Sequence, residues 1–461
     1  MERLRLKVRD VNPADRTGLR RDLIASGVAV ALVATAVVVG TGIEERDGTL
    51  EVDWPPLSAE WLPHLGPGTP AALAVAVLAI GYGPTLAARL RWRTLLLSGW
   101  VASMAWIWSL ALVDGWYRGV EKQLNQKNDY LRVVDRFDDI PAALRTFVDH
   151  IPLHSPDNWP AHIAGHPPAA TLTFVFLDRI GLGGGGWAAA WCVTIGATAV
   201  IAVLIALRAL ADETLARKAA PFLTLAPAAV WFGVSGDAYF AAVAAWTVAL
   251  LALAATRTTR FPAAAAGSGL LFGLLVYLSY GLTLFAAVVA AVLIVARAWR
   301  PLPYFFAGAL VVPLAFTLAG FNWWEAYQVL VVRYNEGAGG TRPYSYWVWG
   351  NLACTALVVG AAGVAGIRRL LGAAPSAIRG ALTARTSETD RFVALLLSVL
   401  AAVAVADLSG MSKAETERIW LPFTFFLLAA AALLPERGRR WWLTAQAVLA
   451  LSVNHLLVTS W

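Results

Sequence analysis

The chain has 461 residues, of which 58% are apolar and only 15% are charged, and its mean hydropathy is +0.61. Ordinary soluble domains carry about 25% charged residues, so this composition excludes a soluble enzyme and predicts an all-α, polytopic membrane protein. The formal net charge is +7; we expect it to reflect which side of the membrane the basic loops occupy, and not a nucleic-acid partner.

Thirteen apolar segments are candidates for membrane crossings, because a hydrocarbon core of about 30 Å requires roughly 20 apolar residues per helix. The predicted spans are 23–42, 70–88, 94–113, 187–207, 219–234, 238–255, 263–279, 281–296, 302–320, 346–366, 392–406, 419–434 and 441–460. The first run follows a charged segment and lacks a small-residue cleavage site, which indicates a retained span. We therefore predict a basic N-terminus at 1–22 and a single transmembrane domain at 23–461.

The basic loops of this threading all fall on the side of the N-terminus. They are RLRWR (89–93), TRTTR (256–260), RAWR (297–300), ERGRR (436–440) and the linker 367–391. The positive-inside rule then predicts a multi-pass protein of the inner (plasma) membrane with a cytoplasmic N-terminus. The strong preference for Arg over Lys is typical of a GC-rich genome and favours an actinobacterial type of membrane protein.

The apolar run 167–182 is left over, because a full crossing there would move every later basic loop to the outside. We predict a short helix that dips in from the outer side and returns through the glycine-rich stretch 181–186. Such a geometry is tolerated where protein or a cavity covers the backbone. The alternative is a full span, with a neighbouring span miscounted.

The long first outer loop, 114–167, contains one amphipathic segment, FDDIPAALRTFVDHI (137–151). Pro141 occupies a first-turn position that a helix tolerates. The apolar residues share one helical face: Ile140, Leu144, Phe147, Val148 and Ile151. This pattern predicts a short helix lying along the outer membrane interface or, alternatively, a helix packed against other loops.

Three aspartates on the outer side are candidate catalytic residues. Asp114 ends an apolar span, where a carboxylate is costly without a partner or a role. Asp129 lies in the stretch NDYL, and Asp237 lies in SGDAY directly before a span. Each has a simpler alternative: Asp114 and Asp129 as solvated or capping acids, and Asp237 as a helix N-cap.

The outer loop ends in His166-Pro167-Pro168. Adjacent prolines favour an extended approach followed by the first turn of a helix, which predicts that His166 is held at the mouth of a cavity. Four of the six histidines lie within 17 residues here. A divalent metal is therefore a possible cofactor, with His162 and His166 as its ligands, although the prolines break any regular ligand spacing.

A second charged cluster lies in DLSGMSKAETERIWLPF (407–423). Lys413 and Glu417 are four residues apart, which would place them on one helical face, and Arg418 follows directly. Such cations at a helix start could bind a lipid phosphate; the alternative is an exposed charged turn. Arg342 lies in the aromatic-rich region 321–349, which is typical of an interfacial belt or, less simply, of a sugar or prenyl site.

Together these elements resemble the GT-C glycosyltransferases that use polyprenyl-phosphate sugars, notably the protein O-mannosyltransferase and aminoarabinose transferase group. The resemblance is carried by Asn128-Asp129-Tyr130, by the predicted interfacial helix, by His166-Pro167-Pro168 and by Asp237. The acid pair of that family is Asp-Glu and is Asn-Asp here, and two spans precede the expected first one. The first departure leaves Asp114 as a rival to Asp129 for the role of base.

The resemblance implies sugar transfer at the outer face, with inversion, from a polyprenyl-phosphate donor to an acceptor glycan, lipid or protein. It implies an Asp as general base, with Tyr130, His166, Lys413, Glu417, Arg418 and Arg342 expected to contact substrate. A non-enzymatic lipid or glycolipid transporter, or a membrane scaffold, is the alternative. Transport predicts charged or broken-helix sites near mid-membrane and repeat symmetry, whereas the acids here gather on one side.

Overall fold

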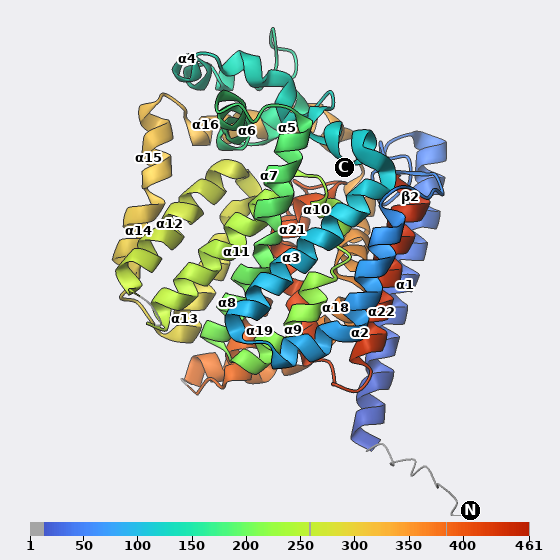
Figure 1. Ribbon diagram of the computed structural model, residues 1–461. Helices are drawn as coiled ribbons and strands as arrows, with labels where there is room; N and C mark the ends of the chain where they lie inside the picture. The colour runs from blue at the N-terminus through green and yellow to red at the C-terminus, as the bar shows by residue number, and fades with distance from the viewer. Residues whose placement is uncertain (1–12, 258–259, 384, 461) are drawn as a thin grey trace, which may run out of the picture.

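A computed structural model describes residues 13–257, 260–383 and 385–460. These residues form a bundle of helices with one small two-stranded sheet at one end (Figure 1). The all-α, membrane-type fold predicted from composition is confirmed. Of the predicted basic N-terminus, residues 1–12 lie outside the described residues, and the first helix, α1, begins at Pro13.

Eight helices of the described chain are long and apolar enough to cross a membrane, as expected of a multi-pass protein. They are α1 (Pro13–Asp47), α2 (Thr69–Arg89), α3 (Trp92–Ala111), the continuous pair α7 (Gly185–Ala197) and α8 (Ala199–Leu210), α11 (Gly236–Ala255), α12 (Phe261–Leu278), α18 (Tyr344–Thr383) and α19 (Glu388–Leu408). A ninth is present if α14 (Leu302–Ala309) and α15 (Val311–Leu318) count as one span with α16 (Trp323–Glu336), which is bent from them by 76°.

The predicted count of thirteen spans is not confirmed, because the other segments are short, interrupted or, in the case of α22, too polar. They are α9 (Glu213–Thr224) with α10 (Ala229–Phe232), η6 (Tyr280–Leu284) with α13 (Phe285–Ala296), α20 (Thr416–Ile419) with α21 (Leu421–Leu427) and η7 (Leu428–Leu433), and α22 (Arg439–Leu456). Most of these pieces are buried. Surrounding helices cover their non-helical backbone, which is the condition for such breaks at membrane depth.

The leftover apolar run forms α6 (Ala169–Arg179), a helix of 11 residues that begins directly after the proline pair. This is about half the length that a crossing requires. The helix packs against η4 (Tyr130–Phe137) and lies at the same end of the bundle as α4 (Ile140–Arg145), α5 (Ala161–Gly165) and α16 (Figure 1).

The amphipathic segment 137–151 is not one helix. It divides into α4 (Ile140–Arg145), capped by the Asp139 side chain on the Ala142 N–H, and a 3-10 turn, η5 (Val148–His150). Phe147 is fully buried, with its ring centroid 5.3 Å from Trp159 and 5.5 Å from Phe321. The segment therefore packs against other loops, which was the alternative to an interfacial helix.

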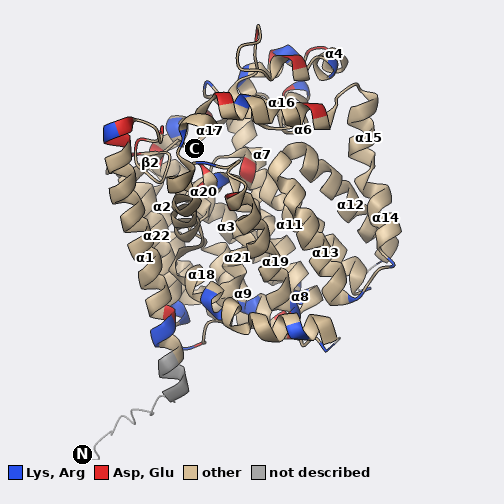
Figure 2. Cartoon of the chain, turned by 180° about the vertical axis from the view of Figure 1, so that it is seen from behind, with Lys and Arg blue, Asp and Glu red and all other residues tan. Residues whose placement is uncertain are grey.

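Charge divides the bundle by its two ends (Figure 2). The α2–α3 turn, the α13–α14 turn and the start of α22 carry Arg side chains at the end where α1 begins. Most acidic side chains of the described chain lie at the opposite end, together with the 114–166 loop. We call these the basic end and the acidic end.

The small sheet joins the chain's last described residues to the acidic end. Strand β1 (Ala59–Trp61) pairs antiparallel with β2 (Leu457–Thr459), with Glu60 opposite Val458. The span predicted at 441–460 therefore stops as a helix at Leu456. The pairing brings Ser460 beside Ser58, with their Oγ atoms 3.0 Å apart.

Candidate active site

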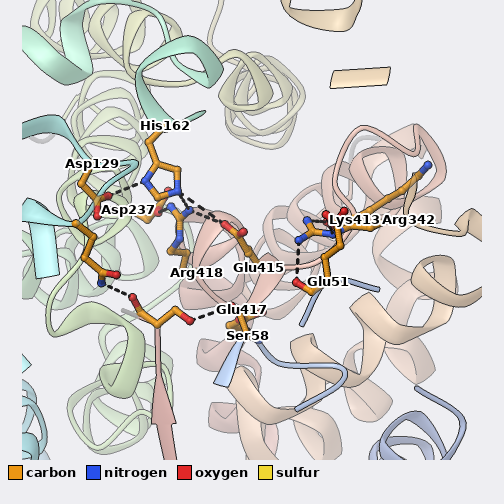
Figure 3. Close-up of polar contacts among 12 residues, drawn as sticks. Glu51, Ser58, Asp129, His162, Asp237, Arg342, Lys413, Glu415, Glu417 and Arg418 are labelled. Carbon is orange, nitrogen blue, oxygen red and sulfur yellow. Dashed lines mark hydrogen bonds and ion pairs between the residues drawn. The ribbon is translucent and has the colours of Figure 1, made fainter. Parts of the chain in front are cut away.

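Four segments far apart in the sequence bring their polar side chains together at the acidic end (Figure 3). Asp129 directly precedes η4, and His162 lies on α5. Asp237 lies in the first turn of α11, and Arg418 lies on the short helix α20. Two of the predicted catalytic acids thus meet a predicted substrate-binding arginine and a predicted metal ligand.

These side chains form a continuous chain of hydrogen bonds. His162 Nδ1 is 2.6 Å from Asp129 Oδ1, and Arg418 Nη2 is 2.9 Å from His162 Nε2. Arg418 Nη1 also donates to Asp237 Oδ2 at 2.6 Å, and its Nη2 to Glu415 Oε2 at 2.8 Å. Because a guanidinium can only donate, His162 Nε2 accepts and Nδ1 carries the proton that is donated to Asp129.

The network is buried, and its opposite charges stabilise one another in the ionised form. Asp129, Asp237 and Arg418 are each at most 5% exposed. Burial lowers the pKa of Arg418, but the carboxylates of Asp237 and Glu415 more than offset this, so that its pKa lies above the ordinary value. Burial raises the pKa of Glu415, but the guanidinium of Arg418 more than offsets this and holds that pKa below its ordinary value. Both groups therefore remain charged near neutral pH.

One wall of a cavity of about 550 Å³ is formed by this network. Asp129, His162 and Glu415 line it, while Asp237 and Arg418 are buried behind them. We call it the site cavity. Its other lining residues include three cations, Lys127, Arg342 and Lys413.

Two of the predicted substrate-binding cations, Lys413 and Arg342, are themselves held by backbone carbonyls. Lys413 Nζ donates to the Gly339 carbonyl at 2.6 Å. Arg342 donates to the carbonyls of Leu50 at 3.0 Å and Lys413 at 2.9 Å. Arg342 thus joins the segment before β1 to the loop that carries Lys413 and Glu415, and both cations contribute positive charge to the cavity wall.

The predicted helical pairing of Lys413 with Glu417 is wrong. Ala414 and Glu415 have φ angles of 70° and 60°, in the left-handed region, so the chain is not helical between Lys413 and Thr416. Helix α20 begins only at Thr416. Glu417 faces away from Lys413: it is fully buried, and its Oε1 accepts from the Ser58 N–H at 3.4 Å. Burial raises the pKa of Glu417 to about 7.

Asp114 lies apart from this network. Its Oδ1 is 2.9 Å from His64 Nε2 and 3.7 Å from Arg118 Nη2, and it lines a different pocket of the acidic end. Of the two rival bases, the structure therefore joins Asp129 and not Asp114 to Asp237 and Arg418.

Tyr130 and His166 are buried beneath the network, and the prediction that His166 lies at a cavity mouth is wrong. The Tyr130 ring stacks on Phe174 at 5.1 Å and lies 6.1 Å from the His166 ring. His166 Nδ1 donates to the Leu278 carbonyl at 2.9 Å, and burial lowers the pKa of His166 to about 4. The His-Pro-Pro element thus packs a neutral histidine under the residue that follows Asp129.

The predicted metal ligands do not form a ligand set. Both ring nitrogens of His162 are engaged, by Asp129 and by Arg418, and His166 bonds a backbone carbonyl. Within the described part of the chain, no group of three or more His, Cys, Asp or Glu side chains is arranged to hold a metal ion.

Glu415 and Lys127 are among the cavity-lining residues that were not predicted as site residues. Glu415 could have been chosen, because it lies inside the charged cluster that includes Lys413 and Arg418. Lys127 gave no signal beyond its position two residues before Asp129. His162 was predicted only as a metal ligand, whereas it links Asp129 to Arg418.

The fold and the site define a multi-pass helical membrane protein with a polar, buried network at one end. No protein-family model matches the sequence, and no curated protein matches it either. Among solved structures it is similar to the Archaeoglobus fulgidus oligosaccharyltransferase in complex with Zn and sulfate, with 17% identity, 78% of this chain and 52% of that chain covered, and a TM-score of 0.45.

It is also similar to ArnT from Cupriavidus metallidurans in the apo state, with 16% identity, 70% and 56% covered, and a TM-score of 0.40. A further structure is the archaeal oligosaccharyltransferase AglB from Archaeoglobus fulgidus with an inhibitory peptide and a dolichol-phosphate, with 14% identity, 78% and 50% covered, and a TM-score of 0.39. The chain spans about half the length of these proteins. Likeness at this level assigns neither an activity nor a substrate to this chain.

Proposed function

We propose that this chain is a membrane glycosyltransferase of the GT-C type, which moves a sugar from a polyprenyl-phosphate donor to an acceptor at the outer face of the membrane. The observation that carries the proposal is the position of Asp129. Its carboxylate lines the site cavity at the acidic end and is bonded to the chain His162–Arg418–Asp237. The basic loops lie at the opposite end of the bundle. By the positive-inside rule the basic end would face the cytoplasm, and the site cavity would therefore open on the outer side.

In this mechanism Asp129 is the general base. An acceptor hydroxyl is a poor nucleophile near neutral pH, and a carboxylate within hydrogen-bond reach can take its proton as the new bond forms. The His162 N–H bonds Oδ1 of Asp129, which orients the carboxylate and leaves Oδ2 to receive the proton. Arg418 holds His162 in this tautomer, and Asp237 and Glu415 hold Arg418 in place.

The leaving group would depart toward positive charge. The acceptor oxygen bonds to the anomeric carbon as the bond from that carbon to the lipid phosphate breaks, and the phosphate leaves with the electron pair. Lys127, Arg342 and Lys413 line the same cavity and would stabilise the developing phosphate charge. A single displacement of this kind inverts the anomeric carbon, as the resemblance to GT-C enzymes implies.

A lipid or glycolipid transporter is the second candidate, and the distribution of charge argues against it. Transporters of the alternating-access type bind substrate near the middle of the membrane, at the interface of repeats. Here the buried ionic network lies toward the acidic end of the bundle, where α20 carries Arg418 (Figure 2). We therefore favour an enzyme that acts at one face, in the inner (plasma) membrane with a cytoplasmic N-terminus.

The test is transfer of label from a panel of polyprenyl-phosphate sugars to envelope acceptors in membranes that contain the full chain. We expect Asp129→Asn to lower the rate by at least about 100-fold, because a general base contributes roughly 10²–10⁴. Asp135→Asn is the matched control, since Asp135 is an exposed acid of the same outer loop. Variants are compared at equal amounts of folded protein.

Two results would contradict this assignment. Absence of transfer by the folded parent chain with every donor would favour the transporter. Loss of transfer in Asp114→Asn, with transfer retained in Asp129→Asn, would show that the other acid is the base.

A further inference from the structure

A second polar pocket lies beside the site cavity at the acidic end. Its volume is about 200 Å³, and we call it the side pocket. Three carboxylates, two cations and an amide are among its lining side chains: Asp53, Glu60, Asp114, Arg118, Lys122 and Gln123. Val458 is the apolar side chain among the described residues that line it.

The side pocket contains polar side chains that are largely withdrawn from solvent, which distinguishes it from a wet surface loop. The Asp114 side chain is 16% exposed, with its Oδ1 2.9 Å from His64 Nε2, and Gln123 is 9% exposed. Asp53 and Glu60 are exposed at the rim. The side pocket therefore offers hydrogen-bonding groups both at its exposed edge and further from solvent. A ligand with several hydroxyl groups could bond to both.

The side pocket and the site cavity share a wall. Gln126 and Ser460 line both. Gln126 Nε2 donates to the Ser460 carbonyl at 2.8 Å and to Gln123 Oε1 at 2.9 Å. The β1–β2 pairing fixes Ser460 in this position beside Ser58, which lines the site cavity. A ligand in the side pocket would therefore be one side chain away from the cavity that holds Asp129.

The lining chemistry selects among ligands. Carboxylates only accept hydrogen bonds, Arg and Lys only donate them, and amides do both, so a neutral group with several hydroxyls can satisfy the whole set. An anionic ligand would face three carboxylates, and an acyl or prenyl chain would meet a lining made mostly of polar and charged residues. The volume is below the roughly 300–1,000 Å³ typical of pockets for drug-sized ligands, which suits a single ring.

We propose that the side pocket binds one sugar unit of a glycan acceptor, whose chain extends across Gln126 and Ser460 so that its reacting hydroxyl reaches Asp129. This inference rests on the glycosyltransferase function proposed above and selects the acceptor class. The role of Asp114 is then to bind the acceptor, which explains why an acid at the end of α3 lies outside the catalytic network.

Binding without transfer tests this inference separately. The probes are neutral tetrasaccharides derived from mannan, galactan, arabinan and glucan, titrated into the detergent-solubilised full chain by calorimetry and ligand-observed NMR, with no donor present. We expect at least one to bind, and expect Glu60→Gln and Asp53→Asn each to weaken that binding by at least about tenfold. Glu45→Gln, at an exposed acid of α1 at the same end, should bind as the parent does.

The outcomes separate this inference from the proposed function. Failure of every tetrasaccharide to bind the folded parent, or equal binding by both rim variants and the parent, would overturn the side pocket as a glycan site, even if label transfer to a lipid or protein acceptor succeeds. Binding that is lost in the rim variants but kept in Asp129→Asn would support it. Melting temperatures equal to that of the parent show that the rim variants are folded.

Discussion

Two buried aspartates, each bonded to arginine, lie at opposite ends of the bundle. At the basic end Asp22 on α1 is fully buried, 2.7 Å from Arg369 Nη2 and 3.0 Å from Arg368 Nη2. At the acidic end Asp237 on α11 is 2.6 Å from Arg418 Nη1. The two sites are made of the same chemical groups, and both contain an Arg–carboxylate contact of the strongest type.

The two sites differ in the other groups to which their arginines are bonded. Arg368 and Arg369 both form ion pairs with Asp22, and these pairs connect the peripheral helix α1 to α18 (Figure 1). Arg418 instead bonds two carboxylates and His162, and through His162 it reaches a carboxylate that lines a cavity. A buried ion pair is therefore weak evidence of function by itself. Its further hydrogen-bond partners show whether it only holds two helices together or is connected to a cavity.

Removing the arginine of the acidic end should have the largest effect on stability. Arg418→Ala leaves Asp237 buried without its guanidinium, and breaking a buried pair from one side costs about 3–5 kcal/mol. We expect a marked fall in melting temperature in detergent together with loss of sugar transfer. Arg93→Ala, at an exposed arginine, is the control, and an unchanged melting temperature in Arg418→Ala would show that the network is not needed for the fold.

Glu417 sharpens the comparison, because it is a buried carboxyl next to Arg418 in sequence, yet it faces Ser58. Its pKa is raised to about 7, so the folded chain holds a proton that the unfolded chain releases above its ordinary pKa of 4.5. The contribution of Glu417 to the free energy of unfolding must then fall as pH rises from about 4.5 to 7 and stay level above. At about 1.4 kcal/mol per pKa unit, the loss is of the order of 3 kcal/mol.

Glu417→Gln removes this titration. We expect the variant to melt above the parent chain at pH 8, and the difference to shrink toward zero as the pH approaches 4.5. Glu45→Gln, at an exposed glutamate, should show no such trend. A difference between Glu417→Gln and the parent that does not change with pH would mean that Glu417 is ionised in the folded chain.

The smallest effect is expected at the basic end. Arg369→Ala leaves Arg368 in contact with Asp22 and both arginines are partly exposed, so we expect a loss of about 1.5 kcal/mol, at the low end for hydrogen bonds to charged groups. Sugar transfer should stay close to that of the parent. Arg379→Ala, at an exposed arginine of the same helix, is the control; a loss as large as that of Arg418→Ala would mean that the two ends do not differ.

Much of the architecture could be read from local sequence properties. The lengths of apolar runs predicted the long helices. The positions of the Arg-rich loops predicted that these loops lie at the same end of the bundle as the start of α1. Asp237 was chosen because a carboxylate beside an apolar run is costly without a role, and Asp129 because of its place in the stretch NDYL of the outer loop. These properties depend on neighbours along the chain, which is why no tertiary structure was needed to find them.

Other features depend on contacts between distant segments. The sequence could not decide between Asp114 and Asp129, because the choice follows from whether His64 or His162 approaches each carboxylate. Nor could it separate Lys413 from Glu417, since their spacing fits a helix and only the left-handed residues between them exclude it.

The sequence by itself therefore determined a multi-pass helical membrane protein and its basic and acidic ends, and it singled out two acids that the structure brings into one network. The tertiary structure decided which spans are broken, that His162 joins Asp129 to Arg418, and that the β1–β2 pairing sets a second pocket beside the site cavity. The physical reason is that hydrophobicity and charge act on each segment separately, whereas a buried hydrogen-bond network exists only where several segments meet.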